Sequence, residues 1–109
     1  MVEALRALGR AIEGGANEDE VAAAWPAPLR PAVVDAVRAI RTFEARVGRA
    51  SGLAAEIVST PSGPAIEVGN RDHVAFGAEH EEAAAVVARC LLPVLEGLGA
   101  TGAFWFTMD

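Results

Sequence analysis

The chain has 109 residues, of which 52% are hydrophobic and 22% are charged, and its formal net charge at pH 7 is -6. This length and composition predict one folded domain over residues 1–109, with neither the charge excess of a disordered protein nor an apolar run that could span a membrane. The acidic charge argues against direct binding of nucleic acid, because phosphate contacts need clustered basic residues.

The start of the sequence and its cysteine content both point to the cytoplasm. Charged residues interrupt what would have to be the apolar core of a signal peptide, namely Glu3, Arg6, Arg10 and Glu13. The single cysteine, Cys90, allows no intrachain disulfide. We therefore expect a soluble protein with no signal peptide and no transmembrane segment.

Residues 1–29 have the pattern of two short helices. The first is predicted over residues 2–13 by an apolar stripe of Val2, Leu5, Leu8 and Ile12. Asn17, followed by three carboxylates, has the pattern of an N-cap for the second. Prolines at 26, 28 and 31 should end that helix near Trp25. We expect this segment to be a helical extension of a core formed by residues 30–109.

Residues 30–49 predict a long amphipathic helix with one basic face. Pro31 suits the first turn of a helix, and apolar residues recur every three or four positions after it. The segment contains five arginines and two carboxylates, whereas residues 50–109 contain two arginines and eight carboxylates. The chain therefore combines a basic helix with an acidic C-terminal half.

The next segment has the pattern of a small antiparallel sheet. Residues 53–59 and 65–69 predict two strands across the turn sequence TPSGP, and residues 73–76 predict a short third strand. Such a segment would form a hairpin or a meander.

A helix and a last strand complete the prediction. Helical composition returns at Ala78, and Pro93 predicts a kink or a break in that helix. Residues 103–109 predict a strand, with Trp105 on one face and Phe104, Phe106 and Met108 on the other. Helices packed on a small antiparallel sheet are typical of an α+β fold.

The sequence around residues 70–84 concentrates possible metal ligands. Together with one residue further on, they are His73, Glu79, His80, Glu81, Glu82 and Cys90. Zinc motifs need ligands on one helix face or paired cysteines, and the two histidines are seven residues apart across a glycine. The glutamates suit the first turn of a helix. We predict no catalytic residue, no metal site and no cofactor.

Four short segments resemble a family of bacteriophage neck and tail-completion proteins. That family combines a long helix, a Thr-Gly-x-Leu step into a hairpin, a Val-Gly strand end, a Phe-Gly step and a proline-containing motif in the last helix. The matching segments here are Ser51-Gly52-Leu53, Val68-Gly69, Phe76-Gly77 and Leu91-Leu92-Pro93. Residues 1–29 lie outside the resemblance.

The resemblance implies a non-enzymatic structural subunit of a phage-like particle, at the neck or the head-proximal end of the tail. Such a subunit would form a homo-oligomeric ring, contact other neck and tail proteins, and pass from the host cytoplasm into the virion. The basic helix and the acidic half would supply a subunit interface comprising Arg38, Arg41, Arg46, Arg49, Phe76, Gly77, Glu79, Glu81, Glu82 and Trp105.

Two alternatives remain open from the sequence. One is a small cytoplasmic binding or regulatory module that pairs with a partner protein through its C-terminal strand. The other, which the ligand spacing favours least, is a metal-dependent enzyme that uses His73, His80 and the nearby carboxylates.

Overall fold

The structure is a computed structural model that describes residues 1–48 and 52–107. Four helices and three strands form an α+β fold, which confirms the predicted class. In chain order they are α1 (Val2–Ile12), α2 (Glu18–Ala23), α3 (Arg30–Val47), β1 (Leu53–Thr60), β2 (Gly63–Asn70), α4 (Glu81–Leu98) and β3 (Thr101–Trp105). Short 3₁₀ turns lie at Ala27–Leu29, Arg71–His73 and Ala78–His80.

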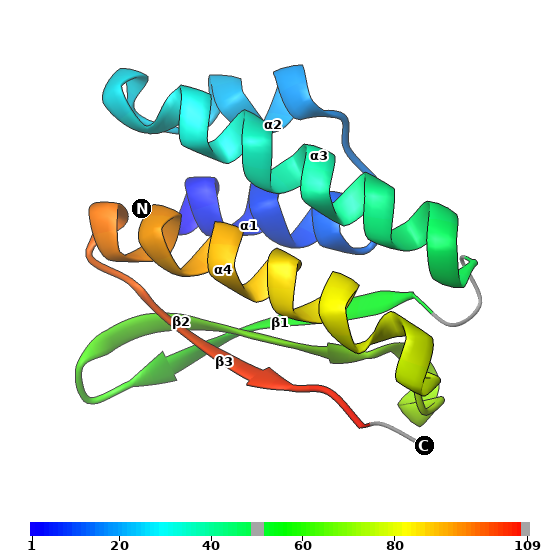
Figure 1. The fold of residues 1–109 in the computed structure, drawn as a ribbon. Coiled ribbons are helices and arrows are strands. Elements are labelled where there is room, and N and C mark those ends of the chain that lie inside the picture. The colour runs from blue at the N-terminus through cyan, green and yellow to red at the C-terminus, as the bar shows by residue number, and fades with distance from the viewer. Residues whose placement is uncertain (49–51, 108–109) are drawn as a thin grey trace.

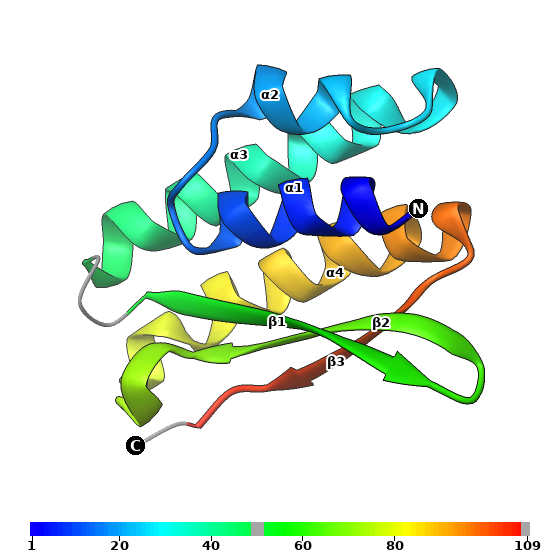
Figure 2. The ribbon, with the colours of Figure 1, turned by 180° about the vertical axis from the view of Figure 1, so that it is seen from behind.

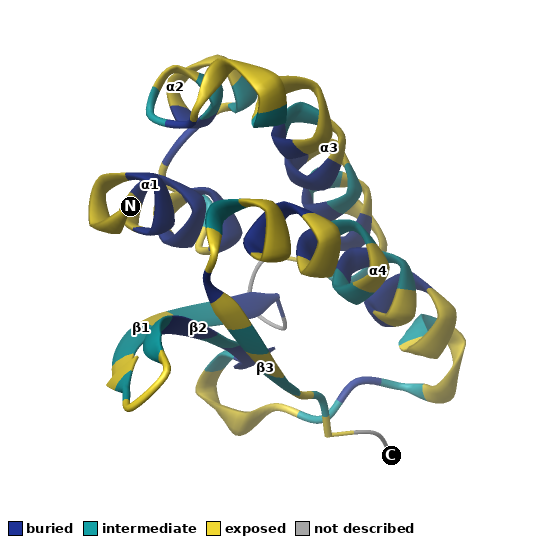
Figure 3. Ribbon diagram, turned by 90° about the vertical axis from the view of Figure 1, so that its left-hand side faces the viewer, coloured by how far each residue is buried: buried dark blue, intermediate teal, exposed yellow. Residues whose placement is uncertain are grey.

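The helices cover only one face of the sheet. In Figures 1 and 2, α1 and α4 lie across that face, and α3 and α2 stack on their far side. Figure 3 shows the buried residues gathered between the helices and the sheet. No described helix lies on the opposite face of the sheet.

The sheet is mixed, which corrects the prediction of an antiparallel one. β1 and β2 form the predicted hairpin, with Thr60 opposite Gly63 across a tight turn. β3 pairs with β2 in parallel, and the strand order is β1-β2-β3. The reason is the connection: α4 carries the chain back across the sheet, as in a β-α-β crossover, and the next strand then runs in the direction of β2.

The predicted strand at residues 73–76 is absent, and a 3₁₀ turn with left-handed backbone interrupts the chain there. Asp72 and His73 have φ angles of 52° and 60°, which no strand accommodates. The Asn70 side chain stabilises this turn, because its amide donates to Val74 O and Thr107 O, each at 2.8 Å. Of the pairing expected for a strand, the described residues keep one bridge, in which the Phe76 N–H donates to Thr107 O at 2.8 Å.

The local signals for the helices were largely accurate. Asn17 caps α2, since its side chain accepts a hydrogen bond from Glu20 N at 2.9 Å. Pro31 lies in the first turn of α3, as predicted. Of the predicted kink or break at Pro93, the break is wrong, because α4 continues through Pro93 to Leu98. Pro93 is solvent-exposed, and the buried residues that follow it keep the helix on the sheet.

Residues 1–29 are part of the single core. Leu5, Leu8 and Ile12 of α1 are fully buried, although Val2 of the predicted stripe is 45% exposed. Trp25 is also buried, and its indole N–H donates to Ala4 O at 2.9 Å. No helix in the described part of the chain has the length and apolar character to cross a bilayer.

Candidate functional site

The uncovered side of the sheet, which we term the open face, is the most distinctive surface of the chain. Strand alternation turns Leu53, Ile66 and Val68 inward, where they are fully buried. The side chains that alternate with these along each strand point outward. They are Ala54, Glu56 and Val58 of β1, Ala65, Glu67 and Gly69 of β2, and Thr101, Ala103 and Trp105 of β3.

Trp105 lies over Gly69 on the open face. The two residues are register partners, and a Cβ built on Gly69 would come within 2.1 Å of the indole Cδ2. The absence of a side chain at this position therefore lets the indole lie flat on the sheet. Trp105 remains 40% exposed. The prediction that it points away from Phe104 and Phe106 is confirmed, because both phenylalanines pack against the core.

Glu56 and Glu67 face each other in the middle of the open face. They are register partners in the β1–β2 ladder. Like charges directly opposite each other destabilise a sheet. Neither carboxylate forms an ion pair with any residue that the structure describes. Local rules of this kind are most often broken at functional sites.

A hollow of about 330 Å3 opens at the end of this face where β2 and β3 terminate. Glu56, Asp72, His73 and Trp105 are among the residues that line it. The His73 and Trp105 rings are 6.1 Å apart, centre to centre. An exposed indole flanked by carboxylates can bind a cation or a flat group, through the face of the ring and through charge.

The predicted metal candidates do not converge. Within the described ranges, no group of three His, Cys, Asp or Glu side chains is close enough to hold a metal ion. His80 Nε2 lies 3.8 Å from Glu79 Oε1, its neighbour in sequence. Cys90 is half-buried on α4.

The basic helix α3 uses most of its arginines within the chain. Arg38 Nε donates to Glu18 Oε2 at 2.9 Å, and this ion pair raises the pKa of Arg38 above its ordinary value. Arg30 Nε donates to the carbonyl oxygens of Ala22 and Trp25, each at 3.0 Å. Arg46 is exposed at the end of the helix, and Arg49 lies outside the described residues.

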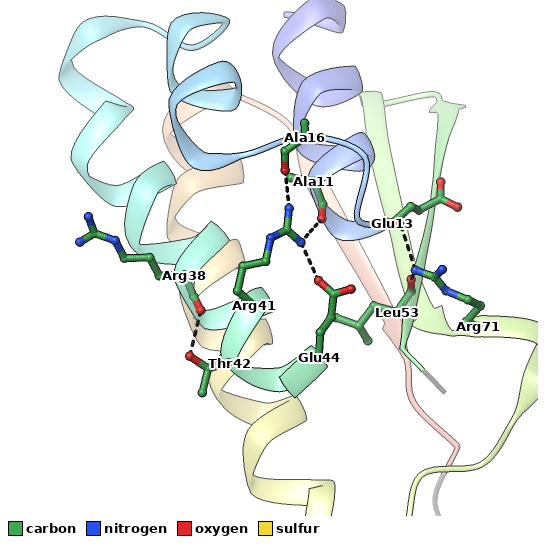
Figure 4. Close-up of polar contacts among 9 residues, drawn as sticks. All are labelled: Ala11, Glu13, Ala16, Arg38, Arg41, Thr42, Glu44, Leu53 and Arg71. Carbon is green, nitrogen blue, oxygen red and sulfur yellow. Dashed lines mark hydrogen bonds and ion pairs between the residues drawn. The ribbon is translucent and has the colours of Figure 1, made fainter. Parts of the chain in front are cut away.

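Arg41 turns inward, which corrects its assignment to a surface for a neighbouring subunit. Its guanidinium contacts Glu44 Oε1 at 2.6 Å and Ala11 O at 2.8 Å, and it also donates to Ala16 O (Figure 4). Glu44 is only 7% exposed. Arg41 therefore joins α3 to the end of α1 and to the loop that follows it.

A second arginine, which the sequence did not single out, also ties elements together. Arg71 Nη2 donates to Leu53 O at 2.8 Å and to Glu13 O at 3.1 Å (Figure 4). It connects the end of β2 to the start of β1 and to the end of α1. Nothing in the local sequence marks this role, since it depends on how three distant segments meet.

The remaining predicted interface residues divide into buried and exposed ones. Phe76 is 1% exposed, and its ring lies 5.0 Å from that of Phe43 in an edge-to-face arrangement. It belongs to the core of its own chain, so its assignment to an interface is corrected. Gly77 follows it at the surface and is half-exposed. The exposed glutamates lie at or just before the start of α4, as predicted: Glu79, Glu81 and Glu82.

No protein-family model, curated protein or solved structure matches the chain. The candidate site is therefore defined by geometry alone. Sequence analysis identified Trp105 but missed Glu56, Glu67, Gly69 and Asp72. The signal for the facing glutamates was present: a two-residue turn at Pro61 and Ser62 fixes the register that places them opposite each other.

Proposed function

We propose that this protein is a non-enzymatic structural subunit that assembles with copies of itself through the open face. The observation that carries this proposal is the exposure of Trp105 on a sheet face that no helix covers. Tryptophan is enriched among the residues that dominate binding energy at protein interfaces. The small neighbours Ala54 and Ala103 allow a partner to approach the sheet closely.

The facing carboxylates support the same proposal. Glu56 and Glu67 repel each other in the isolated chain, so a partner that brings a positive charge between them relieves this repulsion on binding. A surface that served only to face solvent has no need of this arrangement. The pair therefore favours a contact with a basic group over a purely apolar one.

The type of assembly that we propose is the neck or the head-proximal tail end of a phage-like particle. Its support is the sequence resemblance at Ser51-Gly52-Leu53, at Val68-Gly69, at Phe76-Gly77 and at Leu91-Leu92-Pro93. The order of a long helix, a hairpin and a last helix agrees with what that resemblance implies. In this role the chain would form a closed ring of identical copies, contact other neck or tail proteins, and enter the virion from the host cytoplasm.

The alternative, a binding module that pairs through its C-terminal strand, has less support. β3 is already paired with β2, and Thr107 bonds to both Asn70 and Phe76. A partner that took over this strand from its own sheet would first have to displace these contacts. The described sheet has two edge strands, β1 and β3, so a partner strand can also add to the outer edge of either without this displacement.

Sedimentation velocity over a wide concentration range tests self-assembly. The wild type should sediment as a multimer, and Trp105→Ser should sediment as a single chain with unchanged circular dichroism. Val2→Ser removes a side chain of similar exposure, 45%, from α1, which lies on the covered side of the sheet, and serves as the control. A wild type that remains a single chain throughout would contradict the proposal.

A further inference from the structure

We infer that the open face of one copy docks onto the groove between α3 and α4 of the next copy, with Arg46 beside Glu56 and Glu67. This inference rests on the proposed self-assembly and names the second surface that it uses. Such a contact is heterologous, because two different faces of the same chain meet.

Arg46 is the arginine of α3 that is left available for this contact. Arg38 pairs with Glu18, Arg41 is bound to Glu44 and to backbone carbonyls, and Arg30 donates to backbone carbonyls. Arg46 forms neither a hydrogen bond nor an ion pair with the described residues and is solvent-exposed. Its guanidinium can therefore reach a carboxylate of another molecule without breaking a bond in its own.

The groove beside Arg46 provides an apolar recess. A hollow of about 150 Å3 lies between the two helices, lined by Ala39, Thr42 and Phe43 of α3 and by Ala83 and Val86 of α4. Its walls are mainly apolar side chains, and Arg46 forms part of its border. An indole is well suited to such a recess, because it combines a large apolar surface with few rotatable bonds.

The two surfaces are complementary in apolar character and in charge. The open face presents an exposed aromatic ring, Trp105, beside two unpaired carboxylates, whereas the groove presents an apolar recess beside one unpaired guanidinium. Arginine pairs with carboxylates more strongly than neutral donors do. Contact between two open faces is disfavoured, because it would bring the Glu56–Glu67 pairs of both copies together.

The position of the two surfaces fits a repeating contact. The open face lies on the sheet side of the molecule, and α3 lies on the helical side (Figures 1 and 2). A subunit can therefore use both surfaces at once, with a different neighbour at each. Repetition of the contact gives a ring where the rotation closes.

Single-surface variants and their mixture test this arrangement by sedimentation velocity. Arg46→Glu should weaken self-association by roughly tenfold or more, as Trp105→Ser should, because each removes one half of the contact. Arg10→Glu makes the same charge change at an exposed site on α1 and should assemble as the wild type does. Circular dichroism should be unchanged for all three variants.

Mixing Arg46→Glu with Trp105→Ser should produce dimers of one copy of each and nothing larger, since only one intact contact remains possible. Combining Arg46→Glu with Glu56→Arg in one chain should restore assembly. Normal assembly of Arg46→Glu, or a mixture that stays monomeric although the wild type assembles, would overturn the inference but leave self-assembly intact. A monomeric wild type would instead overturn the proposed function and, with it, this inference.

Discussion

Trp105 and Gly69 are register partners in neighbouring parallel strands, and the indole occupies the space that a side chain at residue 69 would need. A Cβ on Gly69 would lie 2.1 Å from both Cδ2 and Cε3 of the ring. The glycine thus determines where the tryptophan lies. The orientation of the main candidate docking residue depends on one position in the central strand.

Gly69→Ala should therefore displace Trp105 from the sheet. We expect a loss of about 1–3 kcal/mol in unfolding free energy, because the added methyl group overpacks the contact. Self-association should weaken as well. Urea unfolding and sedimentation velocity measure the two effects.

Gly63→Ala is no suitable control, since Gly63 has a φ of 114° and an alanine there would be strained by its own backbone conformation. Trp105→Ala with Gly69→Ala should recover much of the lost stability, and failure of this rescue would contradict the proposed contact.

Removing one charge of the Glu56–Glu67 pair should stabilise the isolated chain. Glu56→Gln is expected to raise the unfolding free energy by about 0.2–1 kcal/mol, because it ends a like-charge cross-strand contact. Glu67→Gln should do the same, and the double variant should gain little more than either single variant. Urea unfolding of all four proteins measures this coupling. Two fully additive gains would show that the carboxylates do not interact.

Arg41 should be important for stability and Arg38 should not, although both lie on α3. Arg41→Ala leaves the Glu44 carboxylate buried without its partner and removes the hydrogen bonds that Arg41 donates to Ala11 O and Ala16 O, so we expect a loss of about 2–3 kcal/mol. Arg38→Ala removes an exposed ion pair and should leave the unfolding free energy essentially unchanged. Equal effects of the two substitutions in urea unfolding would contradict the structural role of Arg41.

Deletion of residues 103–109 should prevent folding. The deletion removes most of β3, the packing of Phe104 and Phe106 against the core, and the hydrogen bonds between Thr107 and Asn70. An insoluble or unfolded product is expected, as judged by circular dichroism, whereas full-length Trp105→Ser should fold. A folded monomer with native helical content would show that the strand is dispensable for its own core, and would favour its exchange between subunits.

Local signals in the sequence predicted most elements, and nonlocal ones were missed. The Asn17 cap, the early proline of α3 and the β1–β2 hairpin follow from residues close together in the chain. The parallel pairing of β3 with β2 depends on how α4 crosses the sheet, which no local pattern reveals. The supposed strand at residues 73–76 failed because the side chain of Asn70 stabilises a turn there.

The candidate site was predictable only in part for the same reason. Strand alternation correctly placed Trp105 opposite to Phe104 and Phe106. The facing glutamates were missed because a turn of five residues, TPSGP, was assumed where the hairpin turn has two. Arg41 was assigned to the surface because helical periodicity does not indicate that a long side chain bends back to carbonyl groups of another helix.

Acrylamide quenching of tryptophan fluorescence as a function of protein concentration tests the central claim most directly. The chain has two tryptophans, and Trp25 is 1% exposed, so the quenchable emission reports on Trp105. Trp105→Phe provides the background from Trp25. We predict that quenching of the wild type falls as the protein assembles, because the open face becomes buried. Undiminished quenching in a protein that sedimentation shows to be assembled would contradict a docking role for this face.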